Sequence, residues 1–421
     1  MVTKGRRNVV ICGAGIIGLA SAYYLLERGH SVTILERGAP DHDCCSLGNA
    51  GFISPSHFVP LAAPGVVRKA LGWMWNPESP FYIRPRFDPG LISWGIQFWR
   101  ASSRERAHRA GPLLRDLNLA SRSLFEELAA RAGNEFGLAR EGLLVLVRTG
   151  RGFEEEQKLA LRSRELGMPA EVLDAGQVQA LEPGLELDVV GGVRYPLDAH
   201  LVPHRLVATL TRLVAERGGT FVWHAEALDW NTAQSTVKAA VTGKGEIGGE
   251  DFVLTAGAWT PILTRGLGLR LPMQPGKGYS LTLDAPRRLP KHSLILQEAR
   301  VAVTPMGSSL RVGGTMELAG YDLRINPPRI RGITRSLSEY LPTFRPDDFA
   351  LCRPWCGLRP CTPDGLPYIG RTRRWQNVIV ASGHAMMGVS LGAVTGKLVS
   401  EIVSGIAPSV EISGLSTERF G

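Results

Sequence analysis

The feature that most constrains the fold of this chain lies near its amino terminus, where residues 8–36 read NVVICGAGIIGLASAYYLLERGHSVTILE. An apolar run is followed by the glycine spacing Gly13-x-Gly15-x-x-Gly18, a helical pattern and a second apolar run that ends in Glu36. Strand, glycine turn, helix, strand and acidic residue in this order predict a βαβ unit that binds a dinucleotide. The glycine spacing alone would be weak evidence, but here the strands, the helix and the acidic residue of the unit are all present.

Each part of this unit has a physical reason. Gly13 permits the tight turn after the strand, Gly15 lets the backbone approach a pyrophosphate, and Gly18 lets helix and strand pack closely. The helix amino terminus offers free N–H groups to the phosphates. The carboxylate of Glu36 can accept hydrogen bonds from ribose hydroxyls and would repel a 2′-phosphate, so FAD or NAD is expected. The predicted contacts in this unit are Gly13, Ala14, Gly15, Ile16, Ile17, Gly18, Glu36 and Arg37.

An export signal is the competing interpretation of the same region. Residues 4–22, KGRRNVVICGAGIIGLASA, combine basic residues, an apolar run and an Ala-Ser-Ala end. Cleavage after Ala22 would remove the first strand and all three glycines of the dinucleotide unit. A signal peptide is therefore not expected.

Composition narrows the function classes. The chain has 421 residues, of which 44% are hydrophobic and 21% charged, as in an ordinary globular protein large enough for two cores. The net charge of +9 suits an acidic partner, but no nucleic-acid-binding motif accompanies it, so no nucleic-acid role is expected. Weak attraction to an anionic membrane stays open.

Cysteine usage argues against disulfides and metals. Six cysteines are too few for a disulfide scaffold in a chain of this length, which favours a reducing, cytoplasmic location. Cys352, Cys356 and Cys361 lack the spacing of most zinc sites and have no histidine close by in the sequence. No metal site is predicted.

Five further segments carry a resemblance to a known family. They read SLGNAGFISPSHFVPLAAPG at 46–65, LTAGAW at 254–259, PGKGYSLT at 275–282, WCGLRPCTPDGLPYIG at 355–370 and SGHAMMGVSLG at 382–392. Together with the glycine fingerprint, they resemble the D-amino acid oxidase superfamily of flavoproteins, which includes glycine oxidase and sarcosine oxidase. Within it, the chain is most similar to the bacterial D-amino acid dehydrogenases.

The resemblance implies an α/β fold with two discontinuous domains. A Rossmann-like FAD-binding domain would comprise residues 1–56, 197–265 and 352–421. An antiparallel-sheet substrate domain, a roof over the flavin, would comprise 57–196 and 266–351. Local patterns agree, because 141–150 resembles a buried strand, 204–230 a helix followed by two strands, and 309–318 a strand interrupted by glycines.

The resemblance also implies site residues. Arg359 aligns with the arginine that binds the substrate carboxylate, and a planar guanidinium suits that task better than a lysine; the other interpretation is an arginine that caps the TPDG turn. Tyr279 would supply a hydroxyl to the substrate or simply fill a sheet face, and His57 would line the pocket. Further FAD contacts are expected at Asn49, Ala50, Gly51, Ala256, Gly257, Trp259, Gly357, Gly383, His384, Gly388, Val389 and Ser390.

Two departures from relatives refine these expectations. Glycine oxidase-like members carry a second arginine where this chain has Ala385-Met386-Met387, so the pocket should be apolar enough for bulky D-amino acids or proline-like rings. Sarcosine oxidase relatives attach the flavin through a cysteine where this chain aligns Gly357, so FAD should be non-covalent. His384 is either a proton relay or a structural histidine.

The implied reaction is oxidation of a D-amino acid by hydride transfer from Cα to the flavin N5. Hydrolysis of the imino acid then yields a 2-oxo acid and ammonia, and no protein base is nominated because a dry pocket can keep the amine neutral. Three alternatives stay open: an oxygen-using glycine, sarcosine or D-proline-type oxidase, a flavoprotein subunit of an opine- or amine-oxidising complex, and an NAD-linked dehydrogenase.

Residues 58–100 are the segment that could determine the electron acceptor. They contain many of the tryptophans together with arginines, and no run long enough to cross a bilayer. This segment is either a peripheral membrane surface giving access to a quinone, at the inner face of the cytoplasmic membrane, or a set of packed helices in the roof domain.

Overall fold

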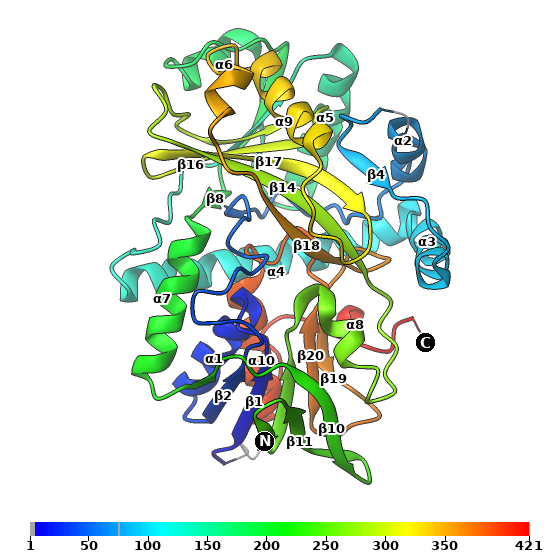
Figure 1. The fold of residues 1–421 in the computed structure, drawn as a ribbon. Coiled ribbons are helices and arrows are strands. Elements are labelled where there is room, and N and C mark those ends of the chain that lie inside the picture. Colours follow the sequence, from blue (N-terminus) through cyan, green and yellow to red (C-terminus); the bar gives the residue numbers. More distant parts are fainter. Residues whose placement is uncertain (1–4, 75, 421) are drawn as a thin grey trace.

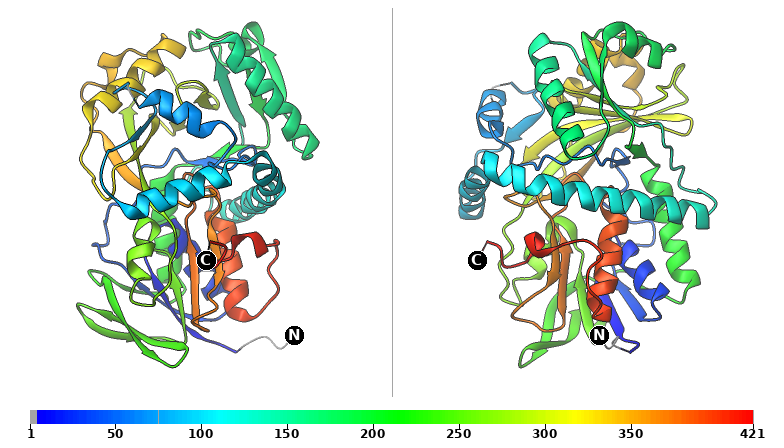
Figure 2. Two further views of the ribbon diagram at one scale, coloured as in Figure 1. Left: turned by 90° about the vertical axis from the view of Figure 1, so that its right-hand side faces the viewer. Right: turned by 180° about the vertical axis from the view of Figure 1, so that it is seen from behind.

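Two lobes make up the structure, a computed structural model that describes residues 5–74 and 76–420 (Figure 1). Residues 1–4, 75 and 421, which fall within the expected domain ranges, lie outside the described part of the chain. The described residues next to both chain ends belong to the lower lobe, and the helix α4 (Arg104–Arg131) crosses between the lobes (Figure 2).

The lower lobe is built on a mainly parallel sheet with strand order β19-β20-β13-β1-β2-β9. Its strands are β1 (Asn8–Cys12), β2 (Ser31–Leu35), β9 (Thr220–Val222), β13 (Asp251–Leu254), β19 (Tyr368–Arg371) and β20 (Val378–Ser382). Only the β19–β20 pair is antiparallel among the described pairs of this sheet. The uninterrupted apolar runs of β1, β13 and β20 suit strands that are covered on both faces.

Helices cover one face of this sheet and a small sheet covers the other. The helices α1 (Ile16–Glu27), α7 (Pro203–Glu216) and α10 (Gly392–Ser404) share a core with alternate strand residues, such as Val9 and Val253. A Cβ at Gly396 would lie 2.5 Å from the backbone of Ala20, so α1 and α10 are in close contact. On the opposite face lie β10 (Ala227–Ala233), β11 (Thr236–Thr242) and β12 (Gly245–Gly248).

The upper lobe, or roof, is a mixed sheet with strand order β18-β14-β17-β16-β15-β5-β7-β6, and β4 pairs with β17. Its strands are β4 (Phe81–Ile83), β5 (Leu143–Val147), β6 (Glu171–Asp174), β7 (Gly191–Tyr195), β14 (Gln274–Asp284), β15 (Ser293–Leu296), β16 (Val301–Met306), β17 (Ser309–Leu318) and β18 (Trp355–Cys361). Helix α9 (Pro327–Tyr340) and an apolar core cover the upper face. The lower face therefore looks toward the dinucleotide unit (Figure 1).

Several expectations can be compared with these elements. The strands expected at 141–150, 204–230 and 309–318 are confirmed as β5, β9, β10 and β17. The segment 58–100 forms α2 (Val66–Trp73), β4 and α3 (Pro89–Ala101) at the outer side of the roof. The strand β18, which the expected boundary at residue 352 places in the FAD-binding domain, is hydrogen-bonded to β14 in the roof sheet.

The remaining elements connect or flank the sheets. They are α5 (Gly150–Glu165), α6 (Ala175–Leu181), α8 (Thr260–Leu263) and the short antiparallel pair β3 (Phe52–Ile53) and β8 (Ala199–His200). Among the described residues, no helix combines the length and apolar character needed to cross a bilayer.

Candidate active site

A cavity of about 1470 Å³ separates the dinucleotide unit from the roof sheet. The turn between β1 and α1, the loop after β2, the loop after β20 and the lower face of β14, β17 and β18 all contribute to its wall. Segments far apart in the sequence thus meet at one space. Its volume exceeds the roughly 300–1,000 Å³ of a typical ligand pocket, as a large cofactor together with a substrate would need.

The glycine turn has the geometry that the sequence predicts. Gly13 has φ +114°, and a Cβ on it would lie 2.9 Å from the carbonyl oxygen of Thr255. A Cβ on Gly18 would lie 1.9 Å from the carbonyl oxygen of Gly13, so α1 could not pack against the turn. At Gly15 the nearest atom, Ser46 Oγ, would be 3.8 Å away, and the residue borders the cavity. Space for a phosphate is therefore open in front of the α1 amino terminus.

Glu36 lies at the end of β2 with its carboxylate held from both sides. Its Oε2 accepts a hydrogen bond from the N–H of Ala14 at 2.9 Å, and its Oε1 accepts one from Gly38 at 2.9 Å. The residue is buried and borders the cavity. Next to it, the guanidinium of Arg37 stacks 3.8 Å above the ring of Trp259. The structure brings the predicted ribose acceptor and two predicted cofactor contacts together.

Substitution of Glu36 by glutamine should weaken FAD binding by about 10- to 100-fold, because hydrogen bonds to a charged acceptor contribute about 1.5–3 kcal/mol. Titration of apoprotein with FAD, followed by flavin fluorescence, measures the change in Kd. The exposed Asp41 provides a matched acid-to-amide control, Asp41→Asn, that should leave the Kd unchanged. Equal effects of the two substitutions would contradict the assignment.

The loop at residues 49–51 is fixed by an arginine that the sequence analysis did not single out. Arg311, on β17, donates from Nη1 to the carbonyl oxygens of Leu47 at 2.6 Å and Asn49 at 3.0 Å. Burial lowers the pKa of this guanidinium to about 10, which leaves it charged at neutral pH. Gly51 has φ +76° and would collide with Leu201 if it had a Cβ. The loop is therefore held between the roof and the lower lobe.

The loop after β20 brings Gly388, Val389 and Ser390 to the cavity wall. Ser390 Oγ donates to Asn118 Oδ1 at 2.6 Å and accepts from the N–H of Ser54 at 2.9 Å, which ties this loop to α4 and to the segment after β3. His384 lies at the cavity wall, and its Nε2 is 3.0 Å from Thr395 Oγ1. Burial lowers the pKa of its imidazole to about 3, so the ring is neutral.

The other predicted cofactor contacts also lie around this space. Asn49, Ala50, Ala256, Gly257, Trp259 and Gly357 border the cavity. Gly383 has a structural role in the loop instead. It has φ +84°, and a Cβ on it would lie 2.6 Å from Thr362 Cγ2.

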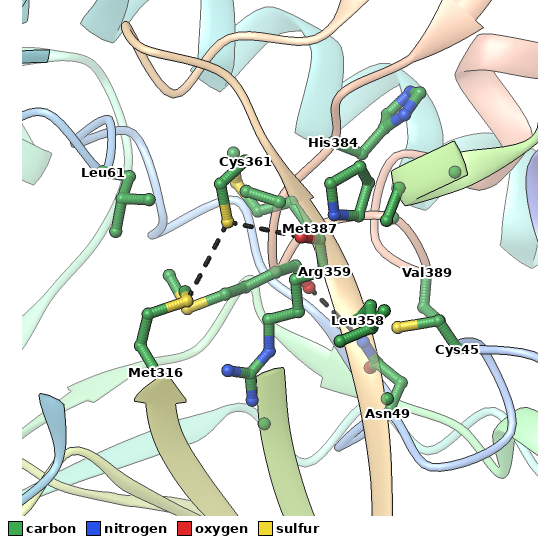
Figure 3. Close-up of a pocket in the computed structure, with 18 of the residues that line it drawn as sticks. Cys45, Asn49, Leu61, Met316, Leu358, Arg359, Cys361, His384, Met387 and Val389 are labelled. Carbon is green, nitrogen blue, oxygen red and sulfur yellow. Dashed lines mark hydrogen bonds between the residues drawn. The ribbon is translucent and has the colours of Figure 1, made fainter. Parts of the chain in front are cut away.

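Arg359 is a half-buried cation that faces the cavity from β18 (Figure 3). Its guanidinium lies directly over Gly278 of β14, where a Cβ would come within 2.2 Å of the guanidinium carbon. Its Nη1 donates to the carbonyl oxygen of Thr315, a residue with φ +67°. Burial lowers the pKa of the guanidinium, and the nearby thiols of Cys45 and Cys361 act in the opposite direction.

No carboxylate among the described residues forms an ion pair with Arg359; its one side-chain hydrogen bond is to a neutral carbonyl. A charge that is partly removed from water and lacks a counter-ion is costly unless a ligand compensates it. The free edge of the guanidinium is thus suited to a carboxylate, which it can bind through two parallel hydrogen bonds.

Tyr279 is among the residues that line the cavity, but its side chain packs on the other face of the roof sheet. Its hydroxyl donates to Glu317 Oε2 at 2.7 Å, and its ring packs in the roof core with Leu281 and Ile333. Burial and the neighbouring Glu317 raise its pKa. A substrate contact through this hydroxyl would require that the bond to Glu317 break, so the geometry favours the packing interpretation of Tyr279.

His57 borders the cavity beside a buried acid. Its Nδ1 is 3.5 Å from Ser56 Oγ, and Ser56 donates to Asp198 Oδ2 at 2.6 Å. Burial lowers the pKa of His57 to about 4, so its imidazole is neutral. Burial also raises the pKa of Asp198 to about 7. Asp198 was not among the residues predicted from the sequence, and no local motif marks it.

Comparison with known proteins assigns the family. The sequence profile described as FAD dependent oxidoreductase (DAO) matches residues 8–402. The chain belongs to this family. As a member of it, the protein is an FAD-dependent oxidoreductase with a Rossmann-like cofactor domain.

Curated relatives align over nearly the whole of this oxidoreductase. A protein of Methylobacterium nodulans named D-amino acid dehydrogenase is 36% identical over 425 residues, which cover 98% of this chain and 99% of the relative. One of the same name from Granulibacter bethesdensis is 32% identical over 418 residues, with the same coverage.

Solved structures show the same fold. Glycine oxidase from Geobacillus kaustophilus superimposes with a TM-score of 0.79 at 24% identity, covering 99% of this chain and 100% of the other. L-α-glycerophosphate oxidase from Mycoplasma pneumoniae, solved with FAD bound, superimposes with a TM-score of 0.73 at 14% identity, covering 98% of each chain.

The residues present fit FAD. The cradle in front of Gly15 is open to a phosphate, Glu36 is placed for a ribose, and the cavity extends from there to Arg359. Gly13, Gly15 and Glu36 would hold the adenosine and pyrophosphate part, and the loop at 388–390 would border the ring system.

Proposed function

We propose that this flavoenzyme is a dehydrogenase that oxidises D-amino acids to 2-oxo acids and ammonia. The observation that carries the proposal is Arg359, a half-buried guanidinium that lines the cavity of an FAD-dependent oxidoreductase and has no counter-ion among the described residues. Relatives named D-amino acid dehydrogenase, 32–36% identical over nearly their full length, support the choice of substrate.

The chain's own residues have three tasks in this reaction. Arg359 binds the substrate carboxylate and so fixes the orientation of Cα. The carbonyl oxygen of Thr315 accepts a hydrogen bond from the guanidinium, and Gly278, which has no side chain, leaves room for it. The neutral imidazoles of His57 and His384, together with apolar neighbours, provide a poorly solvated surrounding that favours an unprotonated amine.

FAD, held non-covalently, supplies the acceptor for the hydrogen and electron pair that leave Cα. The amine lone pair forms the C=N bond as they leave, and water then converts the imino acid to the 2-oxo acid and ammonia. No side chain needs to remove the Cα proton as a base in this scheme.

For the electron acceptor, we propose a membrane quinone reached through peripheral contact of α3. This helix contributes Trp94, Gly95 and Phe98 to the cavity wall, whereas Ile92, Ile96 and Trp99 on its other side are exposed, as is the adjacent Phe87. The exposed Arg84, Arg100, Arg104 and Arg109 surround these side chains in the sequence. An apolar surface with basic neighbours suits an anionic lipid headgroup layer.

Sedimentation with anionic vesicles tests this contact. Wild-type protein should bind phosphatidylglycerol vesicles, and the Phe87→Ser/Trp99→Ser variant should bind at least about tenfold more weakly, since each removes a large exposed apolar side chain. Leu351→Ser removes a leucine that is 100% exposed elsewhere on the roof and should leave binding unchanged. Absence of wild-type binding would contradict a membrane role for α3.

Steady-state assays with a dye acceptor, and oxygen uptake in parallel, test the proposed activity. D-amino acids should reduce the dye rapidly, and L-amino acids, glycine and sarcosine should do so slowly. Rapid oxygen-dependent turnover of glycine or sarcosine would instead favour an oxidase, as in the structurally similar glycine oxidase. Activity in the isolated chain would also exclude the need for a larger complex.

A further inference from the structure

One part of the cavity next to Arg359 has a markedly apolar wall, which we call the side-chain arm. It is formed by β4, α3, the loop before α2 and the ends of β17 and β18. Its residues are Leu61, Ile83, Trp94, Phe98, Met316 and Cys361.

The side-chain arm presents carbon and sulfur to the cavity. Trp94 stacks on Phe98 with ring centroids 4.9 Å apart, and its indole N–H donates to the carbonyl oxygen of Cys361 at 2.9 Å. Met316 Sδ lies 3.9 Å from Cys361 Sγ. None of the six residues of the side-chain arm is charged. A charged ligand group would therefore lose its hydration there without compensation.

The arm is linked directly to Arg359. Cys361 lies two residues after Arg359 on β18, so both side chains project from the same face of the strand. Met316 follows Thr315, whose carbonyl oxygen accepts the hydrogen bond from Arg359. In Figure 3, Leu61 and Met316 lie on one side of Arg359, and Cys45 and Val389 lie on the other.

The positions of Arg359, Val389, Leu61 and Met316 indicate where the carboxylate, the Cα–H and the side chain of a bound amino acid would lie. With its carboxylate on Arg359 and its Cα–H toward the Val389 side, where cofactor contacts are expected, the side chain would point toward Leu61 and Met316. The opposite assignment would leave the apolar wall of the side-chain arm without an occupant.

We propose that the side-chain arm selects D-amino acids with long, uncharged apolar side chains, such as norleucine, methionine and phenylalanine. This inference rests on the proposed function and specifies its substrate class. Burial of each additional methylene should raise kcat/KM about three- to fourfold, so D-norleucine should exceed D-alanine by about 40-fold. D-glutamate and D-lysine should be poor substrates.

The test is a homologous series measured with the FAD-loaded protein. D-alanine, D-2-aminobutyrate, D-norvaline and D-norleucine are assayed with a dye acceptor. In parallel, acetate to hexanoate are titrated, and their Kd is read from the change in flavin absorbance. Both kcat/KM and carboxylate affinity should rise with chain length. The second readout does not depend on turnover.

A matched pair of variants at Leu61 assigns the effect to the arm. Leu61→Asn, similar in size but polar, should lower the preference for D-norleucine over D-alanine about tenfold. Leu61→Met, which stays apolar, should retain the preference.

The outcomes separate the two proposals. A flat or falling series in an enzyme that is active with D-alanine would overturn the side-chain arm and leave the proposed function standing. Equal behaviour of the two Leu61 variants would overturn it as well. Turnover of no D-amino acid of any length would contradict the proposed function itself.

Discussion

Replacement of Arg359 by methionine should lower kcat/KM for D-amino acids by about 100-fold or more, mainly through a higher KM. Loss of one partner from a buried charge pair costs about 2–5 kcal/mol. The guanidinium is half-buried, faces the cavity and has no carboxylate partner among the described residues, so the substrate is expected to provide that partner. Steady-state kinetics with D-alanine and D-norleucine measure the effect.

Two further variants show whether the loss is specific. Arg359→Lys keeps the charge but not the planar pair of donors, so it should recover only part of the affinity. Arg300 also borders the cavity, but it lies in the turn between β15 and β16, and its Nη1 donates to Gln297 Oε1 at 3.3 Å. Arg300→Met should change KM only slightly. An Arg359→Met enzyme with wild-type kinetics would show that the carboxylate binds elsewhere.

Substitution of Gly278 by alanine should lower kcat/KM for D-amino acids by a similar factor, although no charged residue is changed. The new methyl group would come within 2.2 Å of the guanidinium carbon of Arg359, so the guanidinium must leave its position over β14. The expected result is a kcat/KM at least about 30-fold lower, because the pair with the carboxylate would be misaligned. FAD affinity should stay the same, since Gly278 lies on the substrate side of the cavity.

Gly370 provides the control for this substitution. It is also a strand glycine, on β19, but no atom lies within 4 Å of the position that a Cβ would take. Gly370→Ala should therefore leave KM, kcat and FAD binding close to wild type. If Gly278→Ala retained wild-type KM, Arg359 would not bind substrate in the position described.

The dinucleotide unit could be predicted from the sequence because its constraints are local. The tight turn at Gly13 and the close packing at Gly18 each depend on a few residues next to one another in the chain, and both geometries are present in the structure. Glu36 was predicted as a ribose acceptor, and in the structure its carboxylate accepts hydrogen bonds from two backbone N–H groups. Those two bonds depend on how the turn folds back on β2.

The substrate side could be predicted less completely because it depends on strand register. Arg359 was identified through its motif, but its support by Gly278 and Thr315 follows from the pairing of β18 with β14 and of β14 with β17. The same register places Tyr279 on the opposite face from Gly278. Arg311 and Asp198 were missed because their contacts at the cavity, with Leu47 and Ser56, join residues that lie 264 and 142 positions apart in the sequence.

Anaerobic reduction of the bound flavin in a stopped-flow spectrometer tests directly whether the enzyme oxidises D-amino acids. On mixing with excess D-alanine or D-norleucine, the flavin absorbance should bleach fully, and about one equivalent of 2-oxo acid and of ammonia should form per flavin. The L-enantiomers should leave the spectrum oxidised, and Arg359→Met should require far higher D-amino acid concentrations. Bleaching by L-amino acids but not by D-amino acids, or by neither, would contradict the proposal that the enzyme oxidises D-amino acids.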